Sequence, residues 1–134
     1  MTKQGFYISI LAGEDVASQM SHKTRFKYTI ETFSEPVQLL RSVEEKPCNL
    51  LIIEVNHPEF NGFDVKKQAK KIVSSANLIF VSKKRDLATV SSCQRHGADY
   101  LFFTPLDRDK FFDAISILSR RRQYWMDLMK EIKE

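Results

Sequence analysis

The chain has 134 residues, of which 43% are hydrophobic and 28% charged, and this is the size and composition of one globular domain with its own core. The formal net charge is only +4 and the basic residues are scattered, so nucleic acid is not indicated as a partner of this domain. No run approaches the roughly 18 consecutive apolar residues of a membrane helix, and the first residues do not resemble a secretion signal. We therefore expect a cytoplasmic protein that has no membrane partner.

Short apolar runs alternate with helical patterns along the chain. Four runs predict buried strands, at residues 6–11, 49–55, 78–81 and 100–103. Residues 25–32 alternate instead, with Phe26, Tyr28 and Ile30 on one face, which predicts a half-exposed edge strand. The run at 49–55 is the most continuous, as is typical of a central parallel strand buried on both faces.

Each predicted strand is followed by a segment with the period of a helix. Residues 14–21 predict a short helix, and Ser34 is expected to cap a second one ahead of Pro36. The apolar stripe of the second helix is Val37, Leu40 and Val43, and that of the third is Val65, Ala69, Ile72 and Val73. Asp86 and Asp107 are expected to cap the last two helices. Five strands alternating with five helices favour a doubly wound parallel α/β sheet with helices on both faces.

Two motifs narrow this fold class to a family. Glu54 lies near the end of the third predicted strand, Pro58 follows it by four residues, and Gly62-Phe63 begins the next helix. Farther on, Gly97-Ala98-Asp99 precedes the last strand and Thr104-Pro105 follows it. In this order, the motifs resemble those of bacterial response-regulator receiver domains, over roughly residues 6 to 119. The resemblance implies a flavodoxin-like five-stranded parallel sheet in the order 2-1-3-4-5, with five helices.

The same resemblance implies a chemistry that this chain departs from. Receivers place a phosphoryl group on an aspartate with the help of magnesium, and a hydroxyl and a lysine on later strands respond to it. By the resemblance, the acceptor position is Glu54, the hydroxyl is Ser82 and the lysine position is Thr104. Leu101 takes the position of the aromatic switch. Glu54 is either a tolerated relic or a permanent imitation of the modified aspartate, and normal phosphotransfer is not expected.

The acidic pair that holds magnesium in the family has two alignments here. Ala12 and Gly13 lie at the family's distance from Glu54, which leaves no metal ligand, whereas a register shift brings Glu14 or Asp15 into the pocket. We expect no cofactor, with weak magnesium binding only if Glu14 or Asp15 reaches Glu54. Cys48 and Cys93 lack the spacing of a disulfide framework or a zinc site.

The last helix extends farther than a receiver needs. Its apolar residues recur at alternating spacings of four and three, interrupted by Arg122: Phe111, Ile115, Leu118, Arg122, Trp125, Met129 and Ile132. We therefore divide the chain into a receiver-like domain, residues 1–119, and an extension of the helix, residues 120–134. The extension is a dimer seam, a connector to a following domain, or a segment that folds back or frays. Exposed aromatic residues such as Trp125 are typical of an interface.

The sequence thus predicts a non-enzymatic pseudo-receiver that acts through phosphorylation-independent protein contacts, with another protein or with itself. It would be the N-terminal regulatory domain of a larger bacterial regulator or a stand-alone adaptor. The expected interaction surface contains Leu87, Val90, Tyr100 and Phe102 together with the extended helix, while Lys83-Lys84-Arg85 is interpreted as a solvated face. The alternative is a phosphoacceptor receiver of a two-component system with an atypical site.

Overall fold

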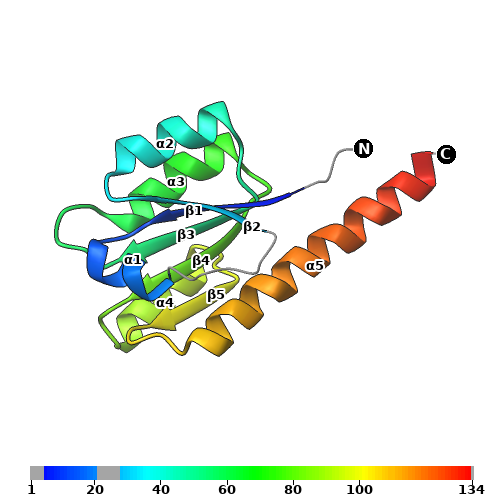
Figure 1. The fold of residues 1–134 in the computed structure, drawn as a ribbon. Coiled ribbons are helices and arrows are strands. Elements are labelled where there is room, and N and C mark those ends of the chain that lie inside the picture. Colours follow the sequence, from blue (N-terminus) through cyan, green and yellow to red (C-terminus); the bar gives the residue numbers. More distant parts are fainter. Residues whose placement is uncertain (1–4, 21–27, 134) are drawn as a thin grey trace.

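The computed structural model describes residues 5–20 and 28–133. The order of elements is β1 (Phe6–Leu11), α1 (Glu14–Met20), β2 (Tyr28–Phe33), α2 (Pro36–Glu45), β3 (Leu50–Val55), α3 (Gly62–Ile72), β4 (Asn77–Ser82), α4 (Leu87–Arg95), β5 (Tyr100–Phe103) and α5 (Arg108–Lys133). The strands form one parallel sheet in the order β2-β1-β3-β4-β5 (Figure 1). The predicted fold class and strand order are confirmed.

The sheet separates two apolar layers, because neighbouring residues of a strand point to opposite faces. Leu51, Ile53 and Val55 of β3 pack with α2, α3 and α4 on one face. Leu50 and Ile52 pack with α1 and α5 on the other. All six residues of β3 are buried, as the continuous apolar run predicted.

The edge strand and the second helix differ in part from their predictions. β2 begins at Tyr28, whose ring meets Phe6 at 5.6 Å, and Phe26 lies outside the described residues. The prediction that Ser34 caps α2 is wrong: Glu35 is the N-cap, without a side-chain capping bond, and Pro36 begins the helix. The fixed φ of proline suits the first helical position, so Pro36 determines where α2 starts.

The apolar stripes of α2 and α3 also differ in part from their predictions. Leu39 and Val43 are the buried residues of α2, whereas Val37 is 58% exposed. Ile72, at the end of α3, is exposed as well. Val37, Leu40 and Ile72 line a shallow groove between the two helices.

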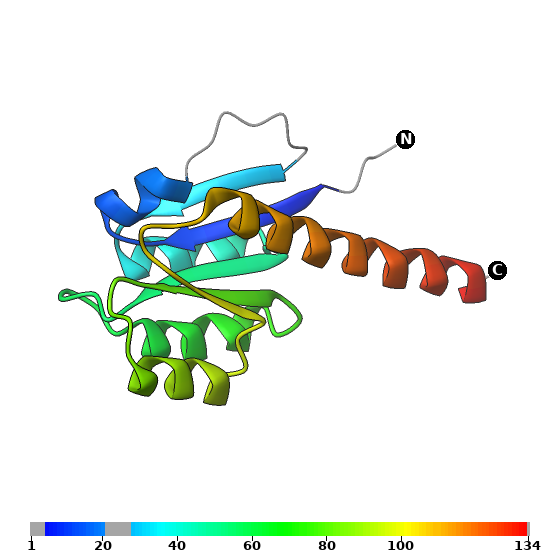
Figure 2. The same ribbon diagram turned by 90° about the horizontal axis from the view of Figure 1, so that it is seen from below.

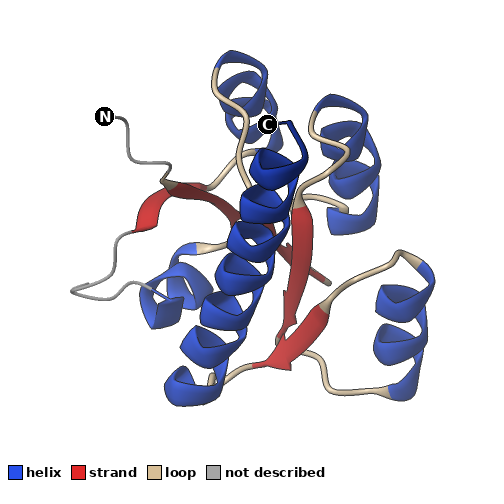
Figure 3. Ribbon diagram, turned by 90° about the vertical axis from the view of Figure 1, so that its right-hand side faces the viewer, coloured by secondary structure: helices blue, strands red, loops and turns tan. Residues whose placement is uncertain are grey.

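The fifth helix is the longest element and reaches beyond the sheet. Phe111, Ile115 and Leu118 are buried against the sheet, and Asp107 caps the helix by accepting a hydrogen bond from the Lys110 backbone N–H at 3.2 Å. α5 continues as one helix to Lys133. Figures 1 and 2 show its second half projecting past the amino ends of the strands, and Figure 3 views it from that side.

Candidate functional site

The carboxyl ends of β1, β3 and β4 meet around one buried carboxylate, that of Glu54. The register of the sheet places Leu11 beside Ile53, and Glu54 beside Val81. Glu54 is 2% exposed and is the one buried charged residue among those described. Its Oε1 accepts a hydrogen bond from the backbone N–H of Gly13 at 2.8 Å. The carboxylate therefore holds the turn that follows β1 against the centre of the sheet.

The four candidate residues that follow β1 have different surroundings. Ala12 is buried and Gly13 contributes its N–H to Glu54, so neither offers a metal ligand at this position. Glu14 is exposed in the first turn of α1. Asp15 turns toward Lys83 and forms an ion pair with it.

This ion pair crosses the mouth of the pocket and was missed by the sequence analysis. Both side chains are more than half exposed, so Lys83 does lie on the surface as predicted, but it has a specific partner. The hydrogen bond from Lys83 holds the pKa of Asp15 below its ordinary value. Asp15, and to a smaller extent the charge of Glu54, raise the pKa of Lys83. Residues 15 and 83 are far apart in the chain, so no local pattern pointed to this pair.

The hydroxyl of Ser82 lies at the end of β4 and is fully buried. It donates to the carbonyl of Lys84 at 3.0 Å and accepts from the Lys84 backbone N–H at 2.9 Å. It also accepts from Nδ2 of Asn56 at 2.9 Å. The same amide donates to Thr89 Oγ1 at 3.0 Å, so Asn56 links β4 to α4.

Asn56 is a site residue that the sequence analysis did not single out. It follows β3 directly and has a φ of +64°, in the left-handed region. Asparagine is enriched in this region among residues other than glycine, and an asparagine right after a strand is the signal that could have identified it.

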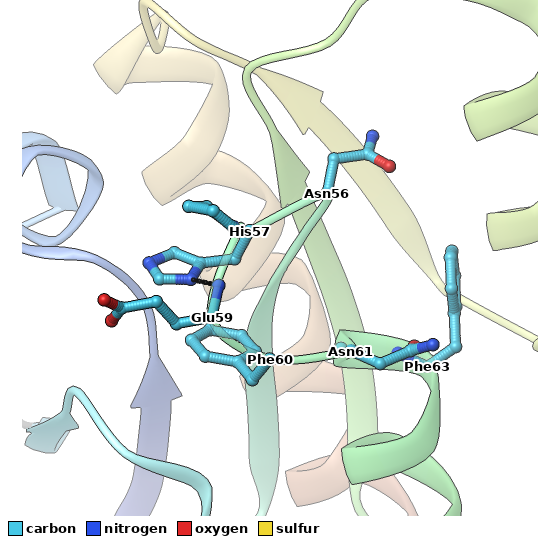
Figure 4. Close-up of a pocket in the computed structure, with 8 residues that line it drawn as sticks. Asn56, His57, Glu59, Phe60, Asn61 and Phe63 are labelled. Carbon is cyan, nitrogen blue, oxygen red and sulfur yellow. Dashed lines mark hydrogen bonds between the residues drawn. The ribbon is translucent and has the colours of Figure 1, made fainter.

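A shallow depression of about 570 Å³ lies beside the pocket, on the loop between β3 and α3 (Figure 4). His57 stacks on Phe60 at a ring distance of 4.2 Å, and its Nδ1 accepts from the Glu59 backbone N–H at 3.0 Å. A Cβ on Gly13 would lie 3.0 Å from Nε2 of His57, so the imidazole lies close against the Gly13 turn. Figure 4 shows the amide of Asn56 turned away from His57 and Phe60.

The lysine position on the last strand is occupied by Thr104. Its backbone N–H donates to the carbonyl of Ser82 at 3.0 Å, and the Thr104-Pro105 peptide bond is cis. The turn after β5 is thus tied to β4 by its main chain, while its side chain supplies no cation.

The donor set does not fit the magnesium ion that receivers use. Hard divalent cations need several oxygen ligands. One oxygen of Glu54 is bonded to Gly13, Asp15 is paired with Lys83, and Ala12 has no side-chain oxygen. Within residues 5–20 and 28–133, no cluster of three or more His, Cys, Asp or Glu side chains is placed to hold a metal ion.

The residues of the predicted interaction surface divide between two faces. Leu87 and Val90 are exposed on α4, at 79% and 40%. Tyr100 and Phe102 instead pack with the α1 and α5 layer, where the Phe102 ring meets Phe111 at 5.5 Å. Leu101 packs against the opposite layer, with α2, α3 and α4.

The projecting part of α5 carries the rest of that surface. Trp125, Met129 and Ile132 are 58%, 57% and 80% exposed, and Arg122 is half-buried. Tyr124 is also exposed and packs edge-on against Trp125 at 5.4 Å. None of the described helices is both long and apolar enough to span a membrane.

The arrangement is that of a receiver: a five-stranded parallel sheet whose pocket lies at the carboxyl ends of β1, β3 and β4. The family model of the response regulator receiver domain matches residues 14–116. The chain belongs to this family, whose members work in two-component signalling.

Individual relatives agree with this assignment. The response regulator protein TodT of Pseudomonas putida is 30% identical over 87 residues, which cover 65% of this chain and 38% of that protein. The response regulator protein TmoT of Ectopseudomonas mendocina is 27% identical over 86 residues, or 64% of this chain and 39% of that protein. The chain therefore matches less than half the length of either relative.

Solved structures support the fold. The receiver domain of AraT from Geobacillus stearothermophilus superposes with a TM-score of 0.80 at 10% identity, covering 92% of this chain and 99% of that one. A CheY-like receiver domain from Methanospirillum hungatei gives a TM-score of 0.73 at 16% identity, covering 90% and 99%.

Proposed function

We propose that this receiver domain is a non-enzymatic signalling module that acts through protein contacts without being phosphorylated. One observation carries the proposal: the polar groups of the pocket are bonded to one another, and the lysine position holds Thr104. A pocket that responds to a phosphoryl group needs donors and a cation that are free to meet it.

Glu54 supports this proposal through its structural role. A phosphoryl group adds about −1.5 to −2 charges and three acceptor oxygens. On Glu54 it would replace the acceptor of the Gly13 N–H within a buried site, and Thr104 would offer no compensating charge. The bond to Gly13 favours the interpretation of Glu54 as a relic kept for the fold over that of a permanent imitation of the modified aspartate.

The setting that we propose is a cytoplasmic regulator of the bacterial type. The matched relatives are longer response regulators, which supports a role as the N-terminal regulatory domain of a larger protein. A stand-alone adaptor is the other setting. In both, α4 and the projecting part of α5 carry the exposed apolar side chains that a protein partner would cover.

The alternative is a receiver that still accepts phosphate at an atypical site. Lys83 favours this alternative, because its ammonium lies at the pocket mouth and interacts with the charge of Glu54. Release of Lys83 from Asp15 would provide a cation that the turn after β5 lacks.

Intact-mass spectrometry decides between the two. The full chain is incubated with magnesium and acetyl phosphate, beside a working receiver domain as positive control. We expect the control to gain a phosphoryl group and this chain to stay unchanged. A stoichiometric gain that Glu54→Gln or Asp15→Asn abolishes would overturn the proposal and identify the acceptor.

A further inference from the structure

The projecting part of α5 presents its apolar residues on the same side of the helix as the buried ones. Trp125 and Ile132 follow Leu118 by 7 and 14 residues, and Arg122 and Met129 follow Ile115 by the same steps. Seven residues complete two turns of an α-helix to within about 20°. The exposed stripe therefore continues the line along which α5 packs on the sheet. It lies on the part of the helix that projects past the domain, as the ribbons of Figures 1 and 2 show.

We propose that this stripe pairs with the same stripe of a second copy of the chain, with the two helices antiparallel. The inference rests on the proposed function, since it names the partner of an interaction that needs no phosphorylation. In this pair Arg122 lies level with Ile132 of the second copy, and Trp125 lies level with Met129 of the second copy. The contacts are of the knobs-into-holes type.

The position of the domain excludes a parallel pair in the same register. Because each domain lies on the side of α5 that carries the stripe, both domains of a parallel pair would need the same space between the helices. Packed helices lie only about 8–10 Å apart, which leaves no room for two domains. In the antiparallel pair the two domains lie at opposite ends of the paired segments, so neither domain lies between the helices.

The charges of the projecting segment favour the same direction. Arg120, Arg121 and Arg122 give its first turn a charge of +3. Residues 127–134 contain three acidic and two basic side chains, a net charge of −1. Parallel helices would place the two arginine runs side by side, whereas antiparallel helices place each run beside the weakly acidic end of the other copy.

Sedimentation of the full chain over a concentration series tests whether the pair forms. The contact is short, so we expect a weak dimer that appears as the concentration rises. Met129→Glu should make the chain monomeric, whereas Leu87→Glu, the same change at an exposed residue of α4, should leave the dimer intact. A chain that stays monomeric at every concentration, or a dimer that survives Met129→Glu, would overturn the inference.

Cross-linking tests the direction of the helices. Arg122→Cys and Ile132→Cys variants of different mass are mixed and oxidised. Residues 122 and 132 are separated by about 15 Å along one helix, so a disulfide joins only positions that the pairing brings level. We expect disulfide-linked dimers that join position 122 of one copy to position 132 of the other. Dimers linked through two cysteines at 122, or through two at 132, would contradict the antiparallel arrangement. Cys48 and Cys93 are both buried, and burial also raises the pKa of each thiol, so we expect the native thiols to stay out of the reaction.

The two proposals can fail separately. A phosphoryl gain in the mass measurement contradicts the proposed function, whatever the state of the dimer. A monomer that gains no phosphoryl group contradicts the antiparallel pair alone.

Discussion

Gly13 and Glu54 are joined by a hydrogen bond of 2.8 Å that runs from a backbone N–H to a carboxylate buried between the strands. Glu54→Gln keeps an acceptor at this position, and Glu54→Met, of similar length, removes it. We expect the free energy of unfolding of the methionine variant to be about 1–3 kcal/mol lower than that of the glutamine variant, because methionine leaves the Gly13 N–H without its acceptor. Urea denaturation measures this difference, and equal stabilities would show that the bond does not hold the turn.

Asn56 combines a strained backbone with two side-chain hydrogen bonds. Asn56→Gly and Asn56→Ala both lose the bonds to Ser82 and Thr89, but only glycine adopts a φ of +64° without cost. We expect the alanine variant to be less stable than the glycine variant by about 1–2 kcal/mol. Thermal and urea unfolding of these two variants measure how much the positive φ of residue 56 costs in stability, because both variants lack the same side-chain hydrogen bonds. If alanine is tolerated as well as glycine, the strain assigned to Asn56 is wrong.

Gly62 begins α3 and lies close to the end of β3. A Cβ at this position would lie 2.5 Å from the backbone carbonyl oxygen of Glu54. We expect Gly62→Ala to lower the free energy of unfolding by about 1–3 kcal/mol, since a strand and a helix would have to move apart. Gly5→Ala is the matched control, because a Cβ there meets only the side chain of Tyr7, at 3.4 Å. Comparable losses in both variants would rule out a specific close approach at Gly62.

The ion pair between Lys83 and Asp15 predicts a change in titration. The hydrogen bond from Lys83 lowers the pKa of Asp15, so this carboxylate favours folding above its pKa in the unfolded chain. This stabilisation is lost as the pH falls through the lowered pKa that Asp15 has in the folded protein. We expect Lys83→Met to raise the pKa of Asp15 toward its ordinary value, as followed by NMR at acidic pH, and added salt to have a similar effect. An unchanged titration would mean that the two side chains do not meet in solution.

The fold was largely predictable because its signals are local. The continuous apolar run ending at Val55 predicted a central strand, and the aspartates at 86 and 107 predicted the starts of α4 and α5. The start of α2 was missed by one residue, because the preference of serine for a cap was given more weight than the preference of proline for the first helical position. Val37 was misplaced because an amphipathic pattern does not tell which of two adjacent faces meets the sheet.

The pocket was only partly predictable because its contacts are non-local. The resemblance placed Glu54, Ser82 and Thr104 at neighbouring strand ends, and the structure brings them there. It did not indicate that Gly13 bonds to Glu54, nor that Lys83 meets Asp15. Such pairs arise from the packing of loops that are distant in the chain.

Helix α5 runs in the opposite direction to the strands of the sheet, so its projecting part and the pocket lie at opposite ends of the domain. The pocket lies at the carboxyl ends of the strands, while α5 leaves the domain past their amino ends (Figure 1). A molecule bound beside Glu54 and one bound along Trp125 would therefore not compete for space. If both positions bind partners, the domain would hold them apart, and the proposed antiparallel pair of chains would present two outward-facing pockets joined by a short helical bridge.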